Sequence, residues 1–327
     1  MARPASDAPT LDKPYGIPML ALALLLAAPA DDFRPLFDGA TLAGWVPVNV
    51  APTTFAVRDG CIVTTGLPTG YLRTDKPYEN FVLEFEWKHT RPAGMANSGL
   101  FVWGDPLPAV GTGYTRSIEV QVLNNYEADW ATSHGDLFSI WGARCKPDRP
   151  HPKGIERCLP SERRVKGPGY WNHYRVTAND GVLKLAVNGK EVSGVSGCSP
   201  RTGYLALESE GSECWFRNIR IQELPTTNPK AEDRAGEWQG HKSLFDGLTL
   251  TGLSGDGWTA SDGVLKPAKG AGPLTTAAPL PAGELVFDTD RGKDGWQRTV
   301  VQFAGGKAAE WPAGAAVRNL FFKEAGK

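Results

Sequence analysis

Hydrophobic and polar residues alternate in short runs over most of the chain from residue 33 onward. In "NFVLEFEWKH", residues 80–89, every second position is apolar and most of the positions between them are charged, a period that predicts a half-buried β-strand. Residues 97–104 form a short apolar strand opened by Ser-Gly, and two further strand signals occupy residues 203–211 and 214–224. Two turn signals, Asp180-Gly181 and Asn188-Gly189, divide residues 173–192 into a β-meander. Because no segment has the period of a long amphipathic helix, we predict an all-β sandwich or jelly roll of two antiparallel sheets.

An internal repeat divides this strand pattern into two parts of unequal length. "LFDGATLAGW", residues 36–45, returns as "LFDGLTLTGL", residues 244–253, with seven of ten positions identical. An Asp-Gly turn follows each copy, at Asp59 and Asp262, and a closing motif recurs as "FRNIRI" and "VRNLFF". The turn and the motif lie 158 residues apart in the first copy and 56 apart in the second. The second copy therefore lacks a large middle part of the first.

The repeat predicts a jelly-roll domain at residues 33–224, a polar linker at 225–239 and a smaller, truncated β repeat at 240–327. The second copy is interpreted as a degenerate duplicate that packs on the first domain, in preference to an auxiliary carbohydrate module. Because Asp38-Gly39 recurs in a copy without the middle strands, we interpret that pair as a structural turn. The same reasoning favours a structural role for Arg217, whose counterpart is Arg318.

The apolar run at residues 17–28 is too short to span a bilayer and is followed by Ala-Pro-Ala. We interpret residues 1–30 as a signal peptide, with a buried N-terminal helix as the alternative. The mature protein is accordingly expected to be periplasmic or secreted. The net charge of −1 and the sequence pI of about 6.5 favour neither nucleic acid nor an anionic membrane as a partner.

The chain has five cysteines. The expected export makes disulfides possible, because disulfides form and persist outside the cytoplasm. Cys145 and Cys158 bracket a charged, Pro-rich segment, and we predict a disulfide between them. Cys198 and Cys214 are the next pair, and Cys61 is left as a buried thiol. No cysteine spacing in the chain fits a zinc site.

The stretch "SIEVQVLNN", residues 117–125, contains the first candidate functional residues. Ile118, Val120 and Val122 share one face, which we predict to be core, so Glu119 and Gln121 must face solvent or a cleft. Asn124 has the parity of the core residues and would reach the cleft only through a β-bulge.

Five stretches, "LFDGATLAGW", "NSGLF", "IEVQVL", "GDLF" and "LALESEG…FRNIRIQEL", together resemble in this order the 3-keto-disaccharide hydrolase domain family. The resemblance covers residues 36–224 and implies a concanavalin-like jelly-roll fold in an exported bacterial protein that acts on oxidised sugars. Members often have Arg where this chain has Trp103 and His where it has Trp215, and residues 141–164 form an insertion. These departures concern the identity of the substrate more than the fold.

Laminarinase-like glucanases of this general fold carry three carboxylates on such a strand, where this chain has Glu119, Gln121 and Asn124. Retaining hydrolysis needs two carboxylates about 5 Å apart, and an amide can replace neither. We therefore reject that mechanism unless Glu208 or Asp136 supplies a second acid. A 3-keto sugar needs instead a base for its acidic C2 hydrogen, a donor for the enolate oxygen and an acid for the leaving group.

Glu119 is the predicted general base or metal-binding carboxylate, with a solvated strand residue as the alternative. His134 and Asp136 are candidates for acid–base catalysis or metal binding. The residues of "SHGDLF" are also common in turns, so an ordinary turn is the alternative. A divalent metal is conceivable, and no spacing demands one. Arg217 would pair a cleft carboxylate or form a structural ion pair. Trp103 and Trp141 would each stack on a sugar ring or lie in the core. The candidate substrate-binding residues are Asn97, Gln121, Asn124, Trp103, Trp141, Glu208 and Arg217.

The leading hypothesis is an exported glycoside hydrolase-like enzyme that cleaves 3-keto-glycosides by elimination and hydration. Such an enzyme would depend on a partner sugar 3-dehydrogenase to make its substrate. The alternative is a carbohydrate-binding module without catalysis that uses the same cleft. In either case the predicted partner is a carbohydrate.

Overall fold

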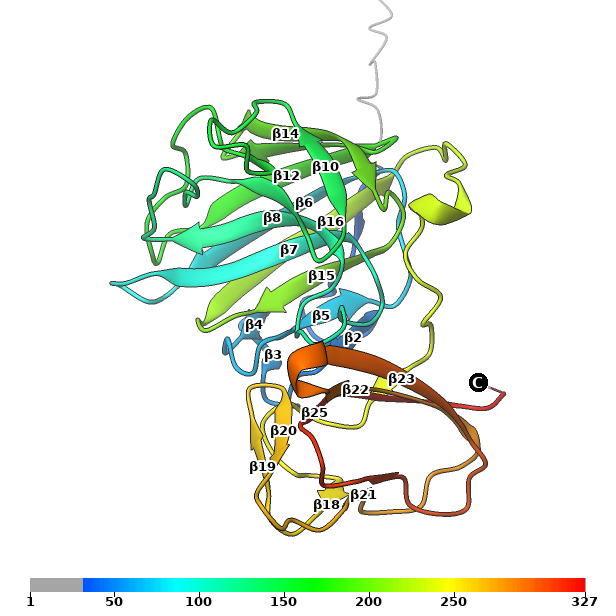
Figure 1. The fold of residues 1–327 in the computed structure, drawn as a ribbon. Helices are drawn as coiled ribbons and strands as arrows, with labels where there is room; N and C mark the ends of the chain where they lie inside the picture. The colour runs from blue at the N-terminus through cyan, green and yellow to red at the C-terminus, as the bar shows by residue number, and fades with distance from the viewer. Residues whose placement is uncertain (1–31, 327) are drawn as a thin grey trace, which may run out of the picture. The chain divides into compact units, whose positions relative to one another are not determined.

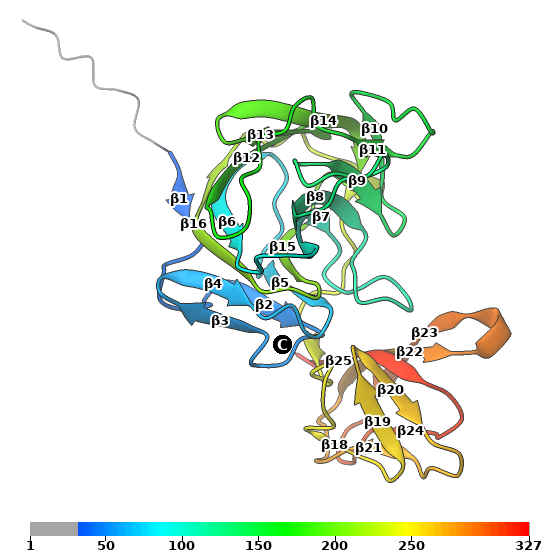
Figure 2. The same cartoon turned by 90° about the vertical axis from the view of Figure 1, so that its left-hand side faces the viewer.

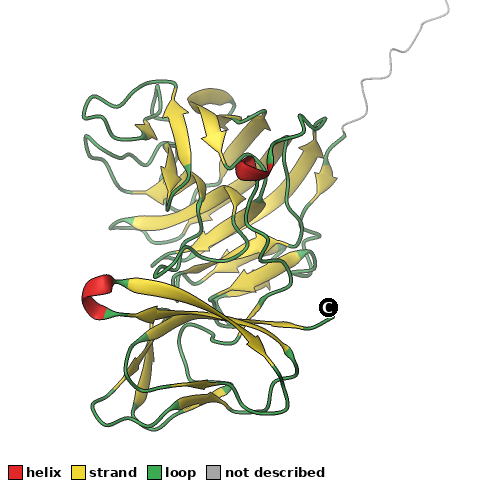
Figure 3. Ribbon diagram, turned by 45° about the vertical axis from the view of Figure 1, so that its right-hand side comes forward, coloured by secondary structure: helices red, strands yellow, loops and turns green. Residues whose placement is uncertain are grey.

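The computed structural model describes residues 32–326, so the predicted signal peptide at residues 1–30 lies outside the described part. Strands dominate the described residues, and the only helical segments among them are two 3-10 turns, η1 (Ala231–Asp233) and η2 (Gly292–Asp294) (Figure 3). Neither helical segment of this part of the chain is long and apolar enough to cross a membrane. All strands from β1 to β25 belong to one compact unit. The prediction of an all-β jelly-roll sandwich is confirmed.

Sheet A, the larger of the two sandwich sheets, has the order β10-β14-β13-β12-β6-β16-β4-β3, and β1 pairs with the C-terminal half of β16 (Figures 1 and 2). Its strands are β1 (Arg34–Pro35), β3 (Phe55–Arg58), β4 (Cys61–Thr64), β6 (Phe81–His89), β10 (Arg144–Pro147), β12 (Asn172–Asn179), β13 (Val182–Val187), β14 (Lys190–Ser199) and β16 (Cys214–Glu223). All pairings in it are antiparallel.

Sheet B has the order β11-β9-β8-β7-β15-β5-β2 and is also antiparallel throughout. Its strands are β2 (Trp45–Val48), β5 (Gly70–Thr74), β7 (Ala96–Gly104), β8 (Ser117–Asn124), β9 (Leu137–Ile140), β11 (Arg157–Cys158) and β15 (Tyr204–Ser209). In this sheet β7 lies between β8 and β15, which brings together two strands that are far apart in sequence.

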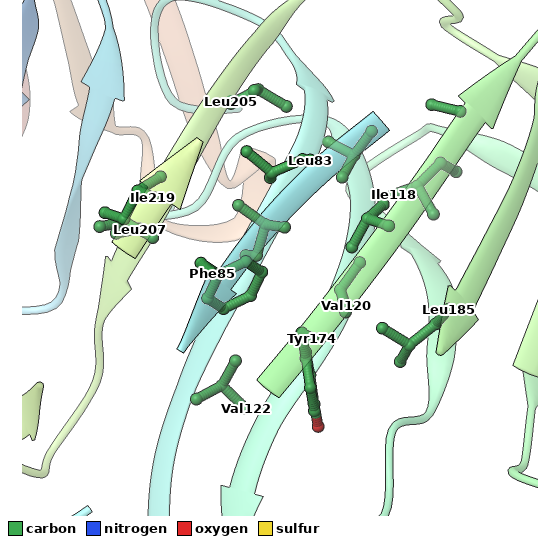
Figure 4. Packing of buried hydrophobic residues seen from close by; sticks show 14 of the residues in the cluster. Leu83, Phe85, Ile118, Val120, Val122, Tyr174, Leu185, Leu205, Leu207 and Ile219 are labelled. Carbon is green, nitrogen blue, oxygen red and sulfur yellow. The ribbon is translucent and has the colours of Figure 1, made fainter. Parts of the chain in front are cut away.

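The main core lies between sheets A and B, as the alternation of the strands requires. Leu83 and Phe85 of β6 and Tyr174 of β12 extend from sheet A toward Ile118, Val120 and Val122 of β8 (Figure 4). Each of these six side chains is at most 1% exposed. The predicted core face of β8 is therefore the face that packs inside the sandwich.

The C-terminal strands form a second, smaller set of sheets. One has the order β19-β20-β25-β22-β23 with β17 beside β25, and the other has the order β18-β21-β24. The strands are β17 (Lys242–Ser243), β18 (Leu253–Ser254), β19 (Trp258–Ser261), β20 (Val264–Pro267), β21 (Leu274–Thr276), β22 (Gly283–Asp290), β23 (Trp296–Phe303), β24 (Glu310–Trp311) and β25 (Val317–Glu324). We call residues 241–326 the C-terminal module. It has its own core, which includes Trp258, Leu265, Leu285 and Trp311.

Asp38 and Asp246 have the same turn geometry. One Asp38 carboxylate oxygen accepts from the backbone N–H groups of residues 40 and 41, and the other accepts from the hydroxyl of Thr41. Asp246 makes the corresponding three bonds, with Thr249 as the hydroxyl donor. Both side chains cap a local turn, as an Asx turn does.

All five cysteines are free in the structure, so the predicted disulfides are not formed. Cys158 is fully buried in the main core, whereas Cys145 lies on β10 with its backbone N–H donated to Glu156. Three strands separate β14, which carries Cys198, from β16, which carries Cys214. At about 4.8 Å per strand, these two thiols lie much too far apart to bond.

Candidate functional site

Glu119 and Gln121 lie on the face of β8 that is turned away from the sandwich interior. Their neighbours Ile118, Val120 and Val122 occupy the interior face, since side chains alternate along a strand. Glu119 is 6% exposed and Gln121 is 5% exposed. We call this outward face of sheet B the site face. It carries an acid and an amide with little access to water.

Glu208 of β15 also belongs to the site face, close to Glu119. Gly99 of β7 lies between the two strands and has no side chain to separate them. A Cβ atom on Gly99 would lie 2.9 Å from Glu119 Oε1 and 3.0 Å from Glu208 Oε2. The two carboxyl oxygens therefore lie no farther apart than the sum of these distances. Of the two residues considered as a second acid, Glu208 is therefore the one that lies beside Glu119.

A third carboxyl group, Glu210, is joined to Glu119 by two amides. Gln121 Nε2 donates to Asn97 Oδ1 at 2.9 Å and lies 3.5 Å from Glu119 Oε1. Asn97 Nδ2 in turn donates to Glu210 Oε2. Asn97 and Gln121, both predicted as sugar-binding residues, thus hold carboxylates in place in this structure. We call Glu119, Glu208 and Glu210 the carboxyl cluster.

The loop at residues 105–116, which connects β7 to β8, adds an aromatic residue to the cluster. The Tyr114 hydroxyl donates to Glu210 Oε1 at 2.7 Å. The Tyr114 ring stacks on Trp141, with ring centroids 6.1 Å apart and an interplanar angle of 9°. Trp141 is 52% exposed, so an aromatic surface lies open beside the cluster. Large exposed aromatic rings of this kind can stack on sugar rings.

Burial and mutual repulsion raise the pKa values of Glu119 and Glu208. Burial raises the pKa of Glu119 to about 8, the charge of Glu210 adds to the effect, and Arg157 opposes it. Burial raises the pKa of Glu208 well above its ordinary value, and the charges of Glu119 and Glu210 act in the same direction. Glu208 Oε2 is buried without a hydrogen-bond partner. Adjacent buried carboxyl groups cannot all ionise, so the cluster holds at least one proton near neutral pH.

His134 and Asp136 are not members of the cluster. Asp136 is fully buried and forms an ion pair with Arg157 at 2.9 Å, and burial raises its pKa. The Arg157 guanidinium in turn covers the ring of Phe138, which pairs with Glu119. His134 lies 3.3 Å from Glu127, and burial lowers the pKa of its ring. Asp136 is thus linked to the site through Arg157, whereas the ion-pair partner of His134 is Glu127, which is not a cluster residue.

The structure places three further candidates away from the site face. Asn124 pairs directly with Ala96 without a bulge and donates to the carbonyl of Lys166. Trp103 is fully buried in the main core, where its Nε1 donates to the Glu79 carbonyl. For both residues the assignment to a sugar cleft is wrong.

Arg217 forms an ion pair with Glu86 of sheet A at 2.7 Å. A register shift after Arg217, with Asn218 at a φ of 52°, breaks the alternation that had suggested an inward side chain. Arg217 therefore cannot pair Glu208, and the structural ion pair is the correct reading. A cavity of about 580 Å³ beside Glu84 and Arg220 lies on this sheet and contains no cluster residue.

Sequence reasoning missed Glu210, Gly99, Tyr114 and Arg157. Glu210 has the same strand parity as Glu208 in "LALESEG", so the alternation could have identified it. Gly99 could be recognised only from the pairing of β7 with β15. Tyr114 and Arg157 lie in a loop and in a two-residue strand, where no periodicity indicates which way a side chain points.

No group of three or more His, Cys, Asp or Glu side chains within residues 32–326 is placed to hold a metal ion. The divalent metal considered from the sequence therefore finds no supporting ligand set in this part of the chain.

The chain is similar to proteins whose names refer to the cleavage of sugars. The profile of the 3-keto-alpha-glucoside-1,2-lyase-like domain matches residues 32–222. A 3-keto-disaccharide hydrolase of Bacteroides thetaiotaomicron is 22% identical over 251 residues, which are 62% of this chain and 82% of that protein.

Two solved structures are similar in their strand arrangement. A candidate glycosyl hydrolase from Parabacteroides distasonis is 23% identical, with a TM-score of 0.46 over 59% of this chain and 94% of its own. The carbohydrate-binding module CBM66 of Bacillus subtilis is 11% identical, with a TM-score of 0.40 over 55% of this chain and 96% of its own.

Proposed function

The chain belongs to the 3-keto-alpha-glucoside-1,2-lyase-like domain family, and on this premise we propose that it cleaves 3-keto-glycosides by elimination followed by hydration. The observation that carries the proposal is the pairing of Glu119 with Glu208 across Gly99. As the pH approaches 8, Glu119 ionises while Glu208 remains protonated, because burial and mutual repulsion raise the pKa of Glu208 well above its ordinary value. The pair therefore offers a base and an acid at one place.

In the first half-reaction, ionised Glu119 removes the proton from C2, which the C3 ketone acidifies. The electron pair left on C2 forms the C1–C2 double bond, and the bond from C1 to the glycosidic oxygen breaks. The departing oxygen takes the proton from Glu208. The products are a sugar enone and the free aglycone alcohol, with Glu119 protonated and Glu208 ionised.

In the second half-reaction, the oxygen of water adds to C1 while Glu208 accepts the water proton and Glu119 returns its proton to C2. Both carboxyl groups recover their starting states, and the net reaction is hydrolysis. Gln121 and Asn97 orient the carboxylates through the hydrogen bonds described above. Arg157 limits the rise of the Glu119 pKa, which keeps a fraction of this base ionised near neutral pH.

The ketone at C3 must be introduced before cleavage, since ordinary glycosides carry a hydroxyl group there. The proposed reaction therefore requires an upstream oxidoreductase, a sugar 3-dehydrogenase, as a metabolic partner. We further propose that the protein acts outside the cytoplasm, as the N-terminal sequence suggests.

Solvent deuterium distinguishes this mechanism from direct displacement. We expect hydrolysis of a 3-keto-glucoside in D2O to place deuterium on C2 of the released sugar during turnover, ahead of exchange without enzyme. Glu119→Gln should abolish release of reducing sugar, and Glu310→Gln, at an exposed carboxylate of the C-terminal module, should leave it unchanged. Turnover that leaves the C2 hydrogen in place would refute elimination and support a retaining displacement by the same pair.

The second candidate function is carbohydrate binding without turnover, which the open Trp141–Tyr114 stack favours. This function predicts measurable binding of sugars by calorimetry with no reducing sugar released from any 3-keto-glycoside. It also predicts that Glu119→Gln retains the affinity of the unaltered protein. Release of aglycone by the unaltered protein would exclude binding as the whole function.

A further inference from the structure

We propose that the C-terminal module positions residues of the site, because its side chains bind the 105–116 loop that carries Tyr114. The module lies outside residues 32–222, which the family profile matches, so membership of the family assigns it no role. The proposal rests on the proposed function only for its kinetic readout. Its structural basis is a set of hydrogen bonds from buried side chains to the loop backbone.

Asn319 of β25 is the centre of this contact. It is fully buried, and its Nδ2 donates to the Thr112 carbonyl at 3.0 Å and to Asp288 Oδ2 at 2.6 Å. Its Oδ1 accepts from Asn49 Nδ2 of the first domain at 2.5 Å. The backbone of Asn319 has a φ of 55°, a left-handed conformation that asparagine tolerates better than most residues. These bonds direct its side chain toward the loop.

Asp288 and Arg298 hold the same loop from the neighbouring strands. Asp288 is fully buried and accepts from the N–H of Gly111 at 3.0 Å. Arg298 binds Asp288 with two nitrogen atoms, at 2.8 and 3.0 Å, and also donates to the Pro108 carbonyl at 2.8 Å. Each member of this ion pair therefore also bonds the loop backbone, and truncating either one would leave its partner as an uncompensated buried charge.

Arg318 also binds the loop, since its Nη1 donates to the Gly111 carbonyl at 2.8 Å. Gly111 also lies against Trp296, because a Cβ atom on this glycine would lie 2.5 Å from Trp296 Cβ. The backbone between Pro108 and Thr112 thus finds its partners mainly in the C-terminal module. Without those partners, its buried polar groups would lack hydrogen bonds and the loop would rearrange.

The effect reaches the carboxyl cluster through Tyr114. This residue lies two positions after the held segment, and the Ala109 N–H donates to the Tyr114 carbonyl at 2.8 Å. Its hydroxyl is bonded to Glu210 and its ring supports Trp141. Asn319, Asp288, Arg298 and Arg318 are therefore positioning residues. They act on the site through the loop and contact no cluster residue themselves.

The test compares Asn319→Ala with Thr276→Val in the full chain. Thr276 is buried in the same module and bonds only within it, at Ala278 and Ala309, so it controls for general damage. Tyrosine labelled with ¹³C at Cζ gives one resonance for Tyr114, assigned with Tyr114→Phe. We expect Asn319→Ala to shift that resonance and to raise amide hydrogen exchange at residues 111–114 at least about tenfold, while Thr276→Val changes neither.

The kinetic arm is a double-mutant cycle with a 3-keto-glucoside. Tyr114→Phe and Asn319→Ala should each lower kcat/KM about tenfold, and the double variant should lose little more than either alone, since both act through one hydroxyl group. Arg318→Met replaces Asn319→Ala if that variant does not fold. Additive losses, or an unchanged Tyr114 resonance in the Asn319 and Arg318 variants, would overturn the proposal. If the unaltered protein has no turnover, the proposed function fails while the resonance and exchange data still decide this inference.

Discussion

Glu119 and Glu208 face each other across Gly99, on strands that are separated by a single intervening strand of sheet B. Each is at most 6% exposed, so their charges interact with little screening by water. Both have raised pKa values, and Glu208 has one carboxyl oxygen without a hydrogen-bond partner. Buried, unpaired acids reduce stability, and such a cost is typical of catalytic sites.

The pH dependence of turnover should report the ionisation of Glu119. Because its pKa is raised to about 8, the fraction that can act as a base increases as the pH rises through that value. Glu208 has a pKa raised well above the ordinary one and remains a proton donor over the same interval. We therefore expect kcat/KM to increase from pH 6 to pH 8 or beyond. A flat profile between pH 6 and 9 would show that another group supplies the base.

Replacement of Glu208 should stabilise the fold in alkaline solution. A carboxyl group with a raised folded-state pKa binds more protons when folded than when unfolded, so its presence lowers stability as the pH rises above about 4.5. Glu208→Gln removes this penalty and should raise the free energy of unfolding at pH 8 by roughly 1–3 kcal/mol, with little effect at pH 4. Thermal melts at the two pH values measure the difference. Glu310→Gln, at an exposed site, should show no such dependence.

The absence of a side chain at residue 99 should be essential to the site but not to the fold. A methyl group there would lie within contact distance of both carboxyl groups, so Gly99→Ala should displace them and lower kcat/KM about 100-fold. Gly167→Ala is the matched change, since a Cβ atom on Gly167 would meet no atom within 4 Å. Steady-state kinetics and circular dichroism of the two variants make the comparison. Full activity in Gly99→Ala would place the chemistry elsewhere.

Trp141 should contribute to substrate binding rather than to bond cleavage. Its exposed ring stacks on Tyr114 beside the cluster, so Trp141→Ala should raise KM or Kd about tenfold and leave kcat nearly unchanged. Trp141→Phe should recover part of the affinity. Tyr170, another exposed aromatic residue, provides the control variant Tyr170→Ala. Equal losses from both alanine variants would mean that Trp141 has no special contact with the sugar.

Strand periodicity predicted the framework of the fold but not the neighbours of each strand. The expected strands at residues 80–89 and 97–104 correspond to β6 (Phe81–His89) and β7 (Ala96–Gly104). The parity of "SIEVQVLNN" correctly separated Glu119 and Gln121 from the core. That Glu208 completes the acid pair depends on β7 pairing with both β8 and β15, which is long-range information that no local pattern carries.

The errors have local causes of the same kind. The repeat correctly favoured a structural role for Arg217, whereas its alternative assignment to the cleft fails because the left-handed Asn218 reverses the alternation of its strand. Trp103 also has a positive φ, of 58°, and its strand is irregular at that end. The cysteine pairs were chosen by their separation along the chain, whereas the sheet order keeps Cys198 and Cys214 apart. Each error arose where tertiary structure overrode a regular pattern.

The apolar cluster shared by the first domain and the C-terminal module affects how a shortened protein would behave. Val48, Tyr71, Phe101 and Ala206 of sheet B are buried together with Val286 and Phe321 of the module. A fragment ending at residue 224 would leave these four side chains in contact with water as one continuous patch. Such patches promote aggregation, so we expect the excised family domain to be poorly soluble even though its own sandwich core is intact.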